Sequence, residues 1–115
     1  KTGALIAASA RSGAIIAGAS EAELESVTRY ARSLGLLFQI TDDLLDVTAT
    51  AKDLGKTPGK DARAQKATYP ALYGLEAARE RAHATYSEAC EALDAIERPT
   101  PILRAIARLI LERRA

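Results

Sequence analysis

Apolar and small residues recur at helical spacing along most of the chain. Over residues 1–19 this spacing predicts a first helix. Residues 20–23 read Ser-Glu-Ala-Glu, the form of a capping box, in which the serine hydroxyl and the glutamate carboxylate each accept from a backbone amide of the helix start. The pattern then continues over residues 21–47 and predicts a long second helix. Gly35 interrupts this helix without stopping it, at a cost of about 1 kcal/mol relative to alanine.

The helical pattern breaks over residues 48–67. This stretch contains two glycines, one proline and four lysines, and Leu54 is its only large apolar residue. Loops of this length inside compact domains are uncommon and are usually functional or disordered. The stretch is therefore a candidate active-site loop.

Two further helices are predicted after this loop. The first begins near Thr68, with Pro70 in its first turn, and ends at residues 97–99. Its predicted buried face consists of Leu72, Leu75, Ala78, Ala82, Tyr86, Ala89 and Leu93. Thr100 is predicted to cap the last helix, with Pro101 at its first position. The apolar stripe predicted for that helix consists of Ile102, Ile106, Leu109 and Ile110. No segment alternates as a strand does, so the predicted fold class is all-α, a bundle of long helices.

The amino-acid composition supports the helical prediction and limits the possible functions. The 115 residues include 25 alanines, which have the highest intrinsic helix propensity and bury little area each. A net charge of +1 is too small to indicate electrostatic binding to nucleic acid or to a membrane surface. No apolar run approaches the roughly 18 residues of a membrane span. A single cysteine, Cys90, excludes an internal disulfide framework. The chain starts at Lys1 and contains no methionine, so we expect it to be a fragment.

The second helix carries a cluster of carboxylates near its C-terminal end. With Asp42 set at 0° on a helical wheel, Asp46 lies at about 40°, Gln39 at about 60° and Asp43 at about 100°. The apolar residues of the same segment fall on the opposite face, and they are Leu37, Ile40, Leu44 and Val47. Carboxylates here oppose the helix dipole, and Asp42 and Asp46 repel one another across one turn.

Two interpretations fit this acidic face. It is either a solvated helix surface or a site where carboxylates hold a cation, and Mg²⁺ suits the second, because it takes one or two protein carboxylates and completes its shell with water and substrate phosphate. The lysines of the following loop favour a diphosphate site, since lysine binds phosphate as a point charge. They are Lys52, Lys56, Lys60 and Lys66, of which Lys52 fits a plain surface charge best. Asp61 is either an outer ligand of the metal or a loop residue.

Five sequence blocks in this order resemble the trans-isoprenyl diphosphate synthases of the polyprenyl synthetase family. The blocks are Lys1-Thr2, Phe38-Gln39, Asp42-Asp43-x-x-Asp46, Leu54-Gly55-Lys56-Thr57-x-Gly59-Lys60-Asp61 and Lys66-Ala67-Thr68-Tyr69-Pro70. The resemblance covers essentially the whole chain, is greatest to geranylgeranyl diphosphate synthases, and corresponds to their C-terminal half. It implies that the chain is a partial domain whose residues 48–67 form the active-site loop.

The resemblance also implies an activity. Such enzymes are all-helical, usually homodimeric, and use Mg²⁺ to ionise an allylic diphosphate. Isopentenyl diphosphate then attacks the carbocation head-to-tail, and a proton is lost. Asp42, Asp43 and Asp46 match the second aspartate-rich motif, which holds the metal.

The other matching residues are implied to contact substrate. Lys1 and Lys56 match lysines on the allylic diphosphate, and Lys66 matches one close to the same metal cluster. Thr2 and Gln39 match polar residues at the reacting centre, beside Phe38 in the cavity wall. His83 and Cys90 lie outside every block and are interpreted as structural.

Part of the family's machinery is not in this sequence. The first aspartate-rich motif and the isopentenyl diphosphate pocket lie upstream of Lys1 in the family, so we expect the fragment alone to be inactive. Alternatives are a non-catalytic partner subunit, a class I terpene cyclase fragment or a plain helical interaction domain. The intact aspartate motif argues against a non-catalytic partner subunit. The absence of an Asn/Ser/Glu-type metal motif after Asp46 argues against a class I terpene cyclase. The resemblance allows a cytoplasmic or plastid location.

Overall fold

The computed structural model describes residues 1–52 and 68–114 of the chain. In this part every regular element is a helix, which confirms the predicted all-α class. The elements are α1 (Thr2–Ile16), α2 (Glu21–Lys52), α4 (Tyr69–Tyr73), α5 (Leu75–Asp94) and α6 (Pro101–Glu112).

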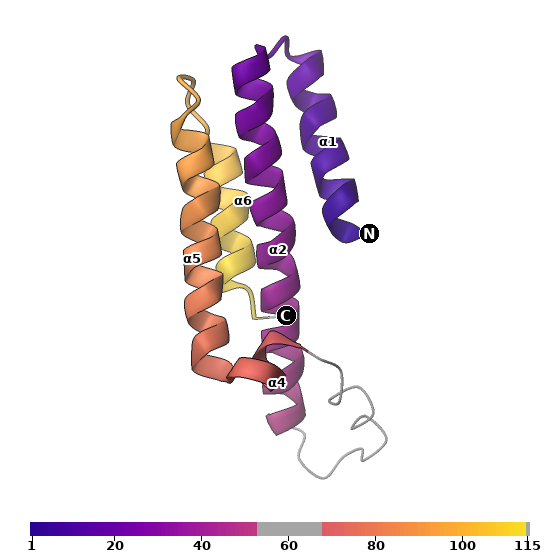
Figure 1. Cartoon of the computed structure of the whole chain (residues 1–115), viewed down its shortest axis with the longest axis vertical. Helices are drawn as coiled ribbons and strands as arrows, with labels where there is room; N and C mark the ends of the chain where they lie inside the picture. The colour runs from indigo at the N-terminus through magenta and orange to yellow at the C-terminus, as the bar shows by residue number, and fades with distance from the viewer. Residues whose placement is uncertain (53–67, 115) are drawn as a thin grey trace.

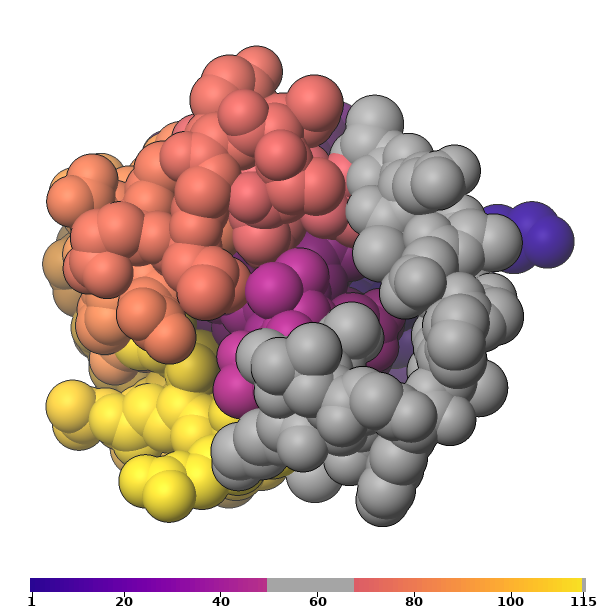
Figure 2. Space-filling model, turned by 90° about the horizontal axis from the view of Figure 1, so that it is seen from below, coloured from indigo at the N-terminus to yellow at the C-terminus, as the bar shows by residue number. Residues whose placement is uncertain are grey.

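Helix α2 is the central element of the bundle. Its 32 residues extend over about 48 Å at 1.5 Å per residue, close to the longest dimension of the 53 × 23 × 21 Å molecule. In Figure 1, α1 lies on one side of α2, α5 and α6 lie on the other, and short α4 crosses near the lower end. Seen from below, the end of α2 lies between the α4–α5 segment and the yellow α6 segment (Figure 2). The C-terminal half of α2 is therefore flanked by helices that follow it in sequence.

The core lies where α2, α5 and α6 meet. One buried cluster consists of Tyr30, Leu34, Ala89, Ala92, Leu93 and Ala107, and a second of Leu37, Ile40 and Ala82. Small alanine side chains on α5 allow its backbone to pack closely against α2. Leu37 and Ile40 belong to the predicted apolar back of the acidic helix, and both are buried as expected.

The start of α2 is capped as the sequence predicts. The Ser20 amide donates to Glu23 Oε1 at 2.9 Å, and the Glu23 amide donates to Ser20 Oγ at 3.1 Å. The hydrogen bond from the Ser20 amide, and to a lesser extent the charge of Arg98, hold the pKa of Glu23 below its usual value. A positive φ of 79° at Gly18 turns the chain between α1 and α2, a conformation that glycine adopts without strain.

The predicted end of the second helix is wrong by five residues. Helix α2 continues past Val47 to Lys52, so the first part of the predicted loop 48–67 is helical. The residues involved include two alanines, and no glycine or proline occurs before Gly55 to stop the helix. The Thr48 hydroxyl donates to the Leu44 carbonyl at 2.8 Å within the added turn. Residues 53–67 lie outside the described part of the chain.

The helix predicted from Thr68 to residues 97–99 is divided into two. Gly74 has a φ of 92°, which ends α4 and begins α5, and α5 itself ends at Asp94. Thr68 caps α4 by accepting from the Ala71 amide at 3.2 Å, with a proline in the first turn as predicted. The prediction that Leu72 and Leu75 are buried is wrong, because these residues flank the break at Gly74 and do not share one continuous helical face: they are 61% and 37% exposed.

The last helix begins at Pro101 as predicted, but Thr100 caps it differently. The Thr100 side chain makes no capping hydrogen bond and instead accepts from Arg104 Nε at 3.2 Å. Most of the stripe predicted for this helix is also exposed, namely Ile102, Ile106 and Leu109. The face that packs on α2 and α5 is rotated from that stripe and consists of Leu103, Ala107, Ile110 and Leu111.

Candidate active site

The carboxylate cluster lies on the side of α2 that faces away from the core. Asp42 and Asp46 are exposed, Asp43 is half-buried and Gln39 is exposed. Helix α2 is continuous through all four positions, so the predicted arrangement on one face over two turns is confirmed. The opposite face is packed against α5, which fixes the direction in which the carboxylates point.

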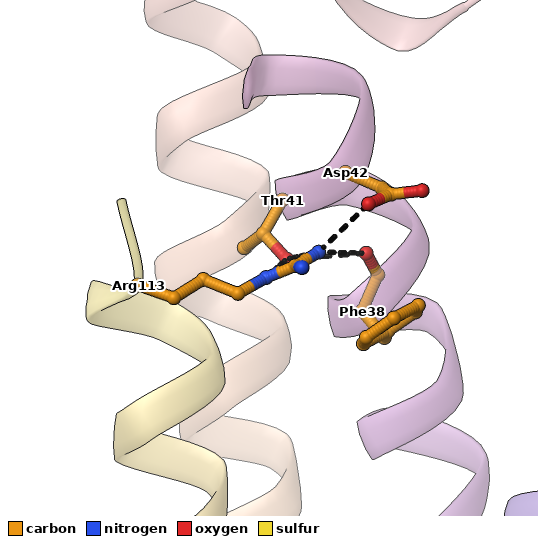
Figure 3. A network of polar contacts seen from close by, with 4 residues as sticks. All are labelled: Phe38, Thr41, Asp42 and Arg113. Carbon is orange, nitrogen blue, oxygen red and sulfur yellow. Dashed lines mark hydrogen bonds and ion pairs between the residues drawn. The ribbon is translucent and has the colours of Figure 1, made fainter. Parts of the chain in front are cut away.

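Arg113, just after α6, reaches across to this segment of α2. Its Nη2 donates to Asp42 Oδ1 at 3.1 Å, to Thr41 Oγ1 at 3.0 Å and to the Phe38 carbonyl at 3.1 Å. Nε also donates to Thr41 Oγ1 at 3.2 Å. Figure 3 shows the guanidinium between these groups and above the Phe38 ring, whose centroid is 4.4 Å from Cζ. One arginine therefore joins a backbone carbonyl, a hydroxyl, a carboxylate and an aromatic ring of α2.

This contact changes the electrostatic interpretation of the acidic face. The repulsion between Asp42 and Asp46 is offset in part by the adjacent guanidinium, whose side chain is only 18% exposed. The sequence analysis missed Arg113 entirely. Its position after an apolar helix gives no signal that it pairs with a residue 71 positions earlier.

Lys1 and Thr2 lie at the start of α1, and both are exposed. Gly35 places this end of α1 against α2, because a Cβ built on it would lie 3.0 Å from the Gly3 Cα. Gly35 is one helical turn before Phe38 and Gln39. The glycine that sequence analysis treated as an interruption thus permits a close approach between the two predicted blocks.

The described residues do not form a complete metal-binding site made of protein ligands alone. Within residues 1–52 and 68–114, no group of three or more His, Cys, Asp or Glu side chains is arranged to hold a metal ion. The donor set still fits Mg²⁺, because this ion is commonly held by one or two protein carboxylates together with water and substrate phosphate. Exposed carboxylates on successive turns of α2 provide such ligands. The remaining predicted residues of the site lie outside the described part of the chain, namely Lys56, Lys60, Asp61 and Lys66.

The fold and this site define an all-α protein with an outward-facing carboxylate cluster on its longest helix. The chain belongs to the polyprenyl synthetase family, whose model matches residues 1–101. Arg113 lies beyond the matched residues.

Three of the curated proteins that are similar to this chain are named as a transferase or as geranylgeranyl diphosphate synthases. A dimethylallyltranstransferase of Fischerella ambigua is 49% identical over 113 residues, which are 98% of this chain and 33% of that protein. The chloroplastic geranylgeranyl pyrophosphate synthase 11 of Arabidopsis thaliana is 55% identical over 93 residues, 81% of this chain and 26% of that protein. A geranylgeranyl diphosphate synthase of Cyanophora paradoxa is 44% identical over 113 residues, 98% of this chain and 38% of that protein.

The chain thus spans about a quarter to two fifths of the length of these relatives. No helix in the described ranges is both long and apolar enough to cross a membrane.

Proposed function

We propose that this chain is part of a prenyltransferase that condenses isopentenyl diphosphate head-to-tail with an allylic diphosphate. The observation that carries the proposal is the acidic face of α2 in a member of the polyprenyl synthetase family. The names of relatives include dimethylallyl, geranylgeranyl and geranylfarnesyl transferases or synthases, so the proposal concerns the reaction class and not one product length.

In this proposal the carboxylates of α2 hold Mg²⁺ against the allylic diphosphate. Asp42 is the direct ligand, and Asp43 and Asp46 act directly or through water. Bound Mg²⁺ would stabilise the negative charge that develops on the departing diphosphate. No nucleophilic side chain is needed, and His83 lies on α5, outside the carboxylate cluster of α2.

In the same proposal, residues at the start of α1 bind the diphosphate of the allylic substrate, which is the leaving group. Lys1 contacts the allylic diphosphate together with Lys56, and Lys66 lies near the same cluster. Thr2 and Gln39 face the reacting centre, and Phe38 lines the cavity. The close approach of Gly3 to Gly35 supports this grouping, since it holds the first turn of α1 beside the turn of α2 that precedes Phe38.

The direct test replaces the metal ligand in the full-length enzyme. Asp42→Asn is expected to lower turnover by at least about 100-fold, because it removes a charge that acts on the transition state. The assay is Mg²⁺-dependent incorporation of labelled isopentenyl diphosphate into an acid-labile product. Glu25→Gln is the matched control, since Glu25 is an exposed carboxylate on the same helix. A near-normal rate for Asp42→Asn at saturating Mg²⁺ would refute the metal site.

A second test concerns the leaving-group side. Lys1→Ala is expected to raise the KM for the allylic diphosphate more than the KM for isopentenyl diphosphate. Varying each substrate in turn measures both constants. Arg79→Ala, which removes an exposed cation on α5, is the control. Equal effects of Lys1→Ala on both substrates would contradict the assignment.

We further propose that residues 1–115 form the C-terminal part of a domain that acts as a homodimer. On this view the 115-residue chain alone is helical but inactive, because it supplies one carboxylate wall of the cavity. Its exposed apolar side chains, including Leu5, Ile16 and Ile102, then favour self-association. Turnover by the purified 115-residue chain would contradict this proposal.

A further inference from the structure

The Arg113 side chain, just after α6, contacts the acidic face of α2 at Asp42. The Arg113 side chain is 18% exposed, while the Asp42 side chain that it meets is 53% exposed. We propose that Arg113 is the positioning residue of this site: it fixes the Asp42 carboxylate and the Phe38 ring so that Asp42 presents its second oxygen to the metal. This inference rests on the proposed function of Asp42.

The contact needs the planar fork of arginine. Nε and Nη2 donate to three acceptors within about one turn of α2, on Phe38, Thr41 and Asp42, while the guanidinium also lies over the Phe38 ring. Lysine has one compact ammonium group on a flexible stem and cannot reproduce this set of directions. The extended backbone of Arg113, with a ψ of 149°, ends α6 at the level where the side chain crosses to α2.

The Phe38 carbonyl and Thr41 hydroxyl hold the guanidinium independently of Asp42. Thr41 is buried, and its own hydroxyl donates to the Phe38 carbonyl at 3.1 Å. The arginine is therefore fixed by α2 itself, and it binds only Oδ1 of the carboxylate. Oδ2 of Asp42 is therefore held in a fixed direction but does not itself contact Arg113.

Two effects of Arg113 on a bound cation have opposite signs. Its positive charge repels a cation at Asp42, so removal of the charge alone would strengthen metal binding. Its hydrogen bonds orient the ligand, and loss of such outer contacts commonly weakens metal binding by about 10–100-fold. The proposal is that orientation outweighs repulsion at this site.

The test measures metal binding directly in the full-length protein. The probe is Mn²⁺ with inorganic diphosphate, and free Mn²⁺ is followed by electron paramagnetic resonance. Arg113→Met and Arg113→Lys are both expected to weaken binding by about tenfold. Tighter or unchanged binding in Arg113→Met, or wild-type binding in Arg113→Lys, would overturn the proposal.

Two controls separate positioning from general damage. Arg108→Met removes an exposed arginine of α6 that pairs with Glu112, and it should leave Mn²⁺ binding unchanged. Circular dichroism melting reports whether each variant is folded. If both Arg113 variants unfold, Thr41→Val decides, because it retains the arginine and removes one anchor. A loss of about threefold in Thr41→Val supports positioning and unchanged binding overturns it.

Asp42→Asn in the same assay distinguishes this inference from the proposed function. If Asp42→Asn binds Mn²⁺ as the wild type does, the metal site itself is refuted. If Asp42→Asn weakens binding while the Arg113 variants do not, only the positioning role is refuted. If Arg113 is a positioning residue, its variants should show a lower kcat in steady-state kinetics and need more Mg²⁺ for activity. Their KM for isopentenyl diphosphate should be unchanged.

Discussion

Helix α1 and the α2–α5–α6 unit are both rich in alanine, yet they differ sharply in burial. No residue of α1 is buried, and Ile16 is 87% exposed. In the other unit Leu37 and Leu93 are fully buried and Tyr30 is 2% exposed. Intrinsic propensity is thus sufficient to predict the helices of both regions, but the buried apolar residues belong to the α2–α5–α6 unit and not to α1.

Helix α1 packs along α2, and the contacts that hold it there include a close backbone approach and a side-chain hydrogen bond. Gly3 packs on Gly35, and Arg11 Nη1 donates to Thr28 Oγ1 at 2.7 Å. Ile6 is the large α1 residue that packs against the buried cluster. The proposed site is divided between the two regions, since Asp42 lies on the stable unit and Lys1 on α1. A change that affects one region should therefore leave the other largely intact.

The largest expected difference comes from truncating a core leucine. Leu93→Ala should lower the free energy of unfolding by about 3 kcal/mol, because it leaves a cavity between α5 and its neighbours. Leu5→Ala on α1 is the matched control. Its side chain is 69% exposed, so the expected change is below about 0.5 kcal/mol. Urea unfolding of the 115-residue chain at low concentration measures both, and similar losses would remove the distinction between the regions.

High pH should weaken the core specifically. Burial raises the pKa of Tyr30 to about 12, and its hydroxyl donates to the Leu103 carbonyl at 2.7 Å. The native state therefore holds this proton more tightly than the unfolded state, whose tyrosine pKa is about 10. The stabilisation is complete below pH 10 and is lost as the pH rises toward 12, at up to about 1.4 kcal/mol per unit. Comparison of urea midpoints at pH 9 and 11 measures it, and Tyr30→Phe should show a smaller change.

A methyl group at Gly35 should detach α1 without unfolding the core. Gly35→Ala forces a Cβ onto the Gly3 backbone, and overpacking of this kind costs about 1–3 kcal/mol. Trypsin cleavage after Arg11 should accelerate by about fivefold or more. The control Gly13→Ala has nothing within 4 Å of its Cβ and should slow cleavage through better helix propensity. Unchanged cleavage in Gly35→Ala would show that the close approach does not hold α1.

The smallest effect is expected at the junction of the two regions. Ser20→Ala removes the side-chain cap of α2 and should cost about 1 kcal/mol. Because the pKa of Glu23 is lowered in the folded chain, the stabilisation from its carboxylate is present above the ordinary value of 4.5 and is lost as the pH falls through the folded value. Glu23→Gln should flatten the acid limb of a thermal melting profile. An unaltered acid limb would contradict the capping role.

Sequence analysis predicted the acidic face because it depends only on helical spacing. Four positions of one continuous helix have fixed relative directions, whatever packs around them. The Arg113 contact could not be predicted in this way, since it depends on where α6 ends against α2. The division at Gly74 was missed because the apolar spacing continues across it, and only the backbone conformation shows the turn. The lysines at positions 56 and 66 remain predictions.

Residue-by-residue amide hydrogen exchange of the 115-residue chain tests the central claim most directly. The claim is that the Asp42–Asp46 segment belongs to the cooperative core, whereas α1, with Lys1 and Thr2, opens separately. Amides of residues 37–46 should then exchange only through global unfolding, and those of α1 through an opening of lower free energy. Equal protection of α1 and the Asp42–Asp46 segment, or faster exchange in the latter, would contradict the account.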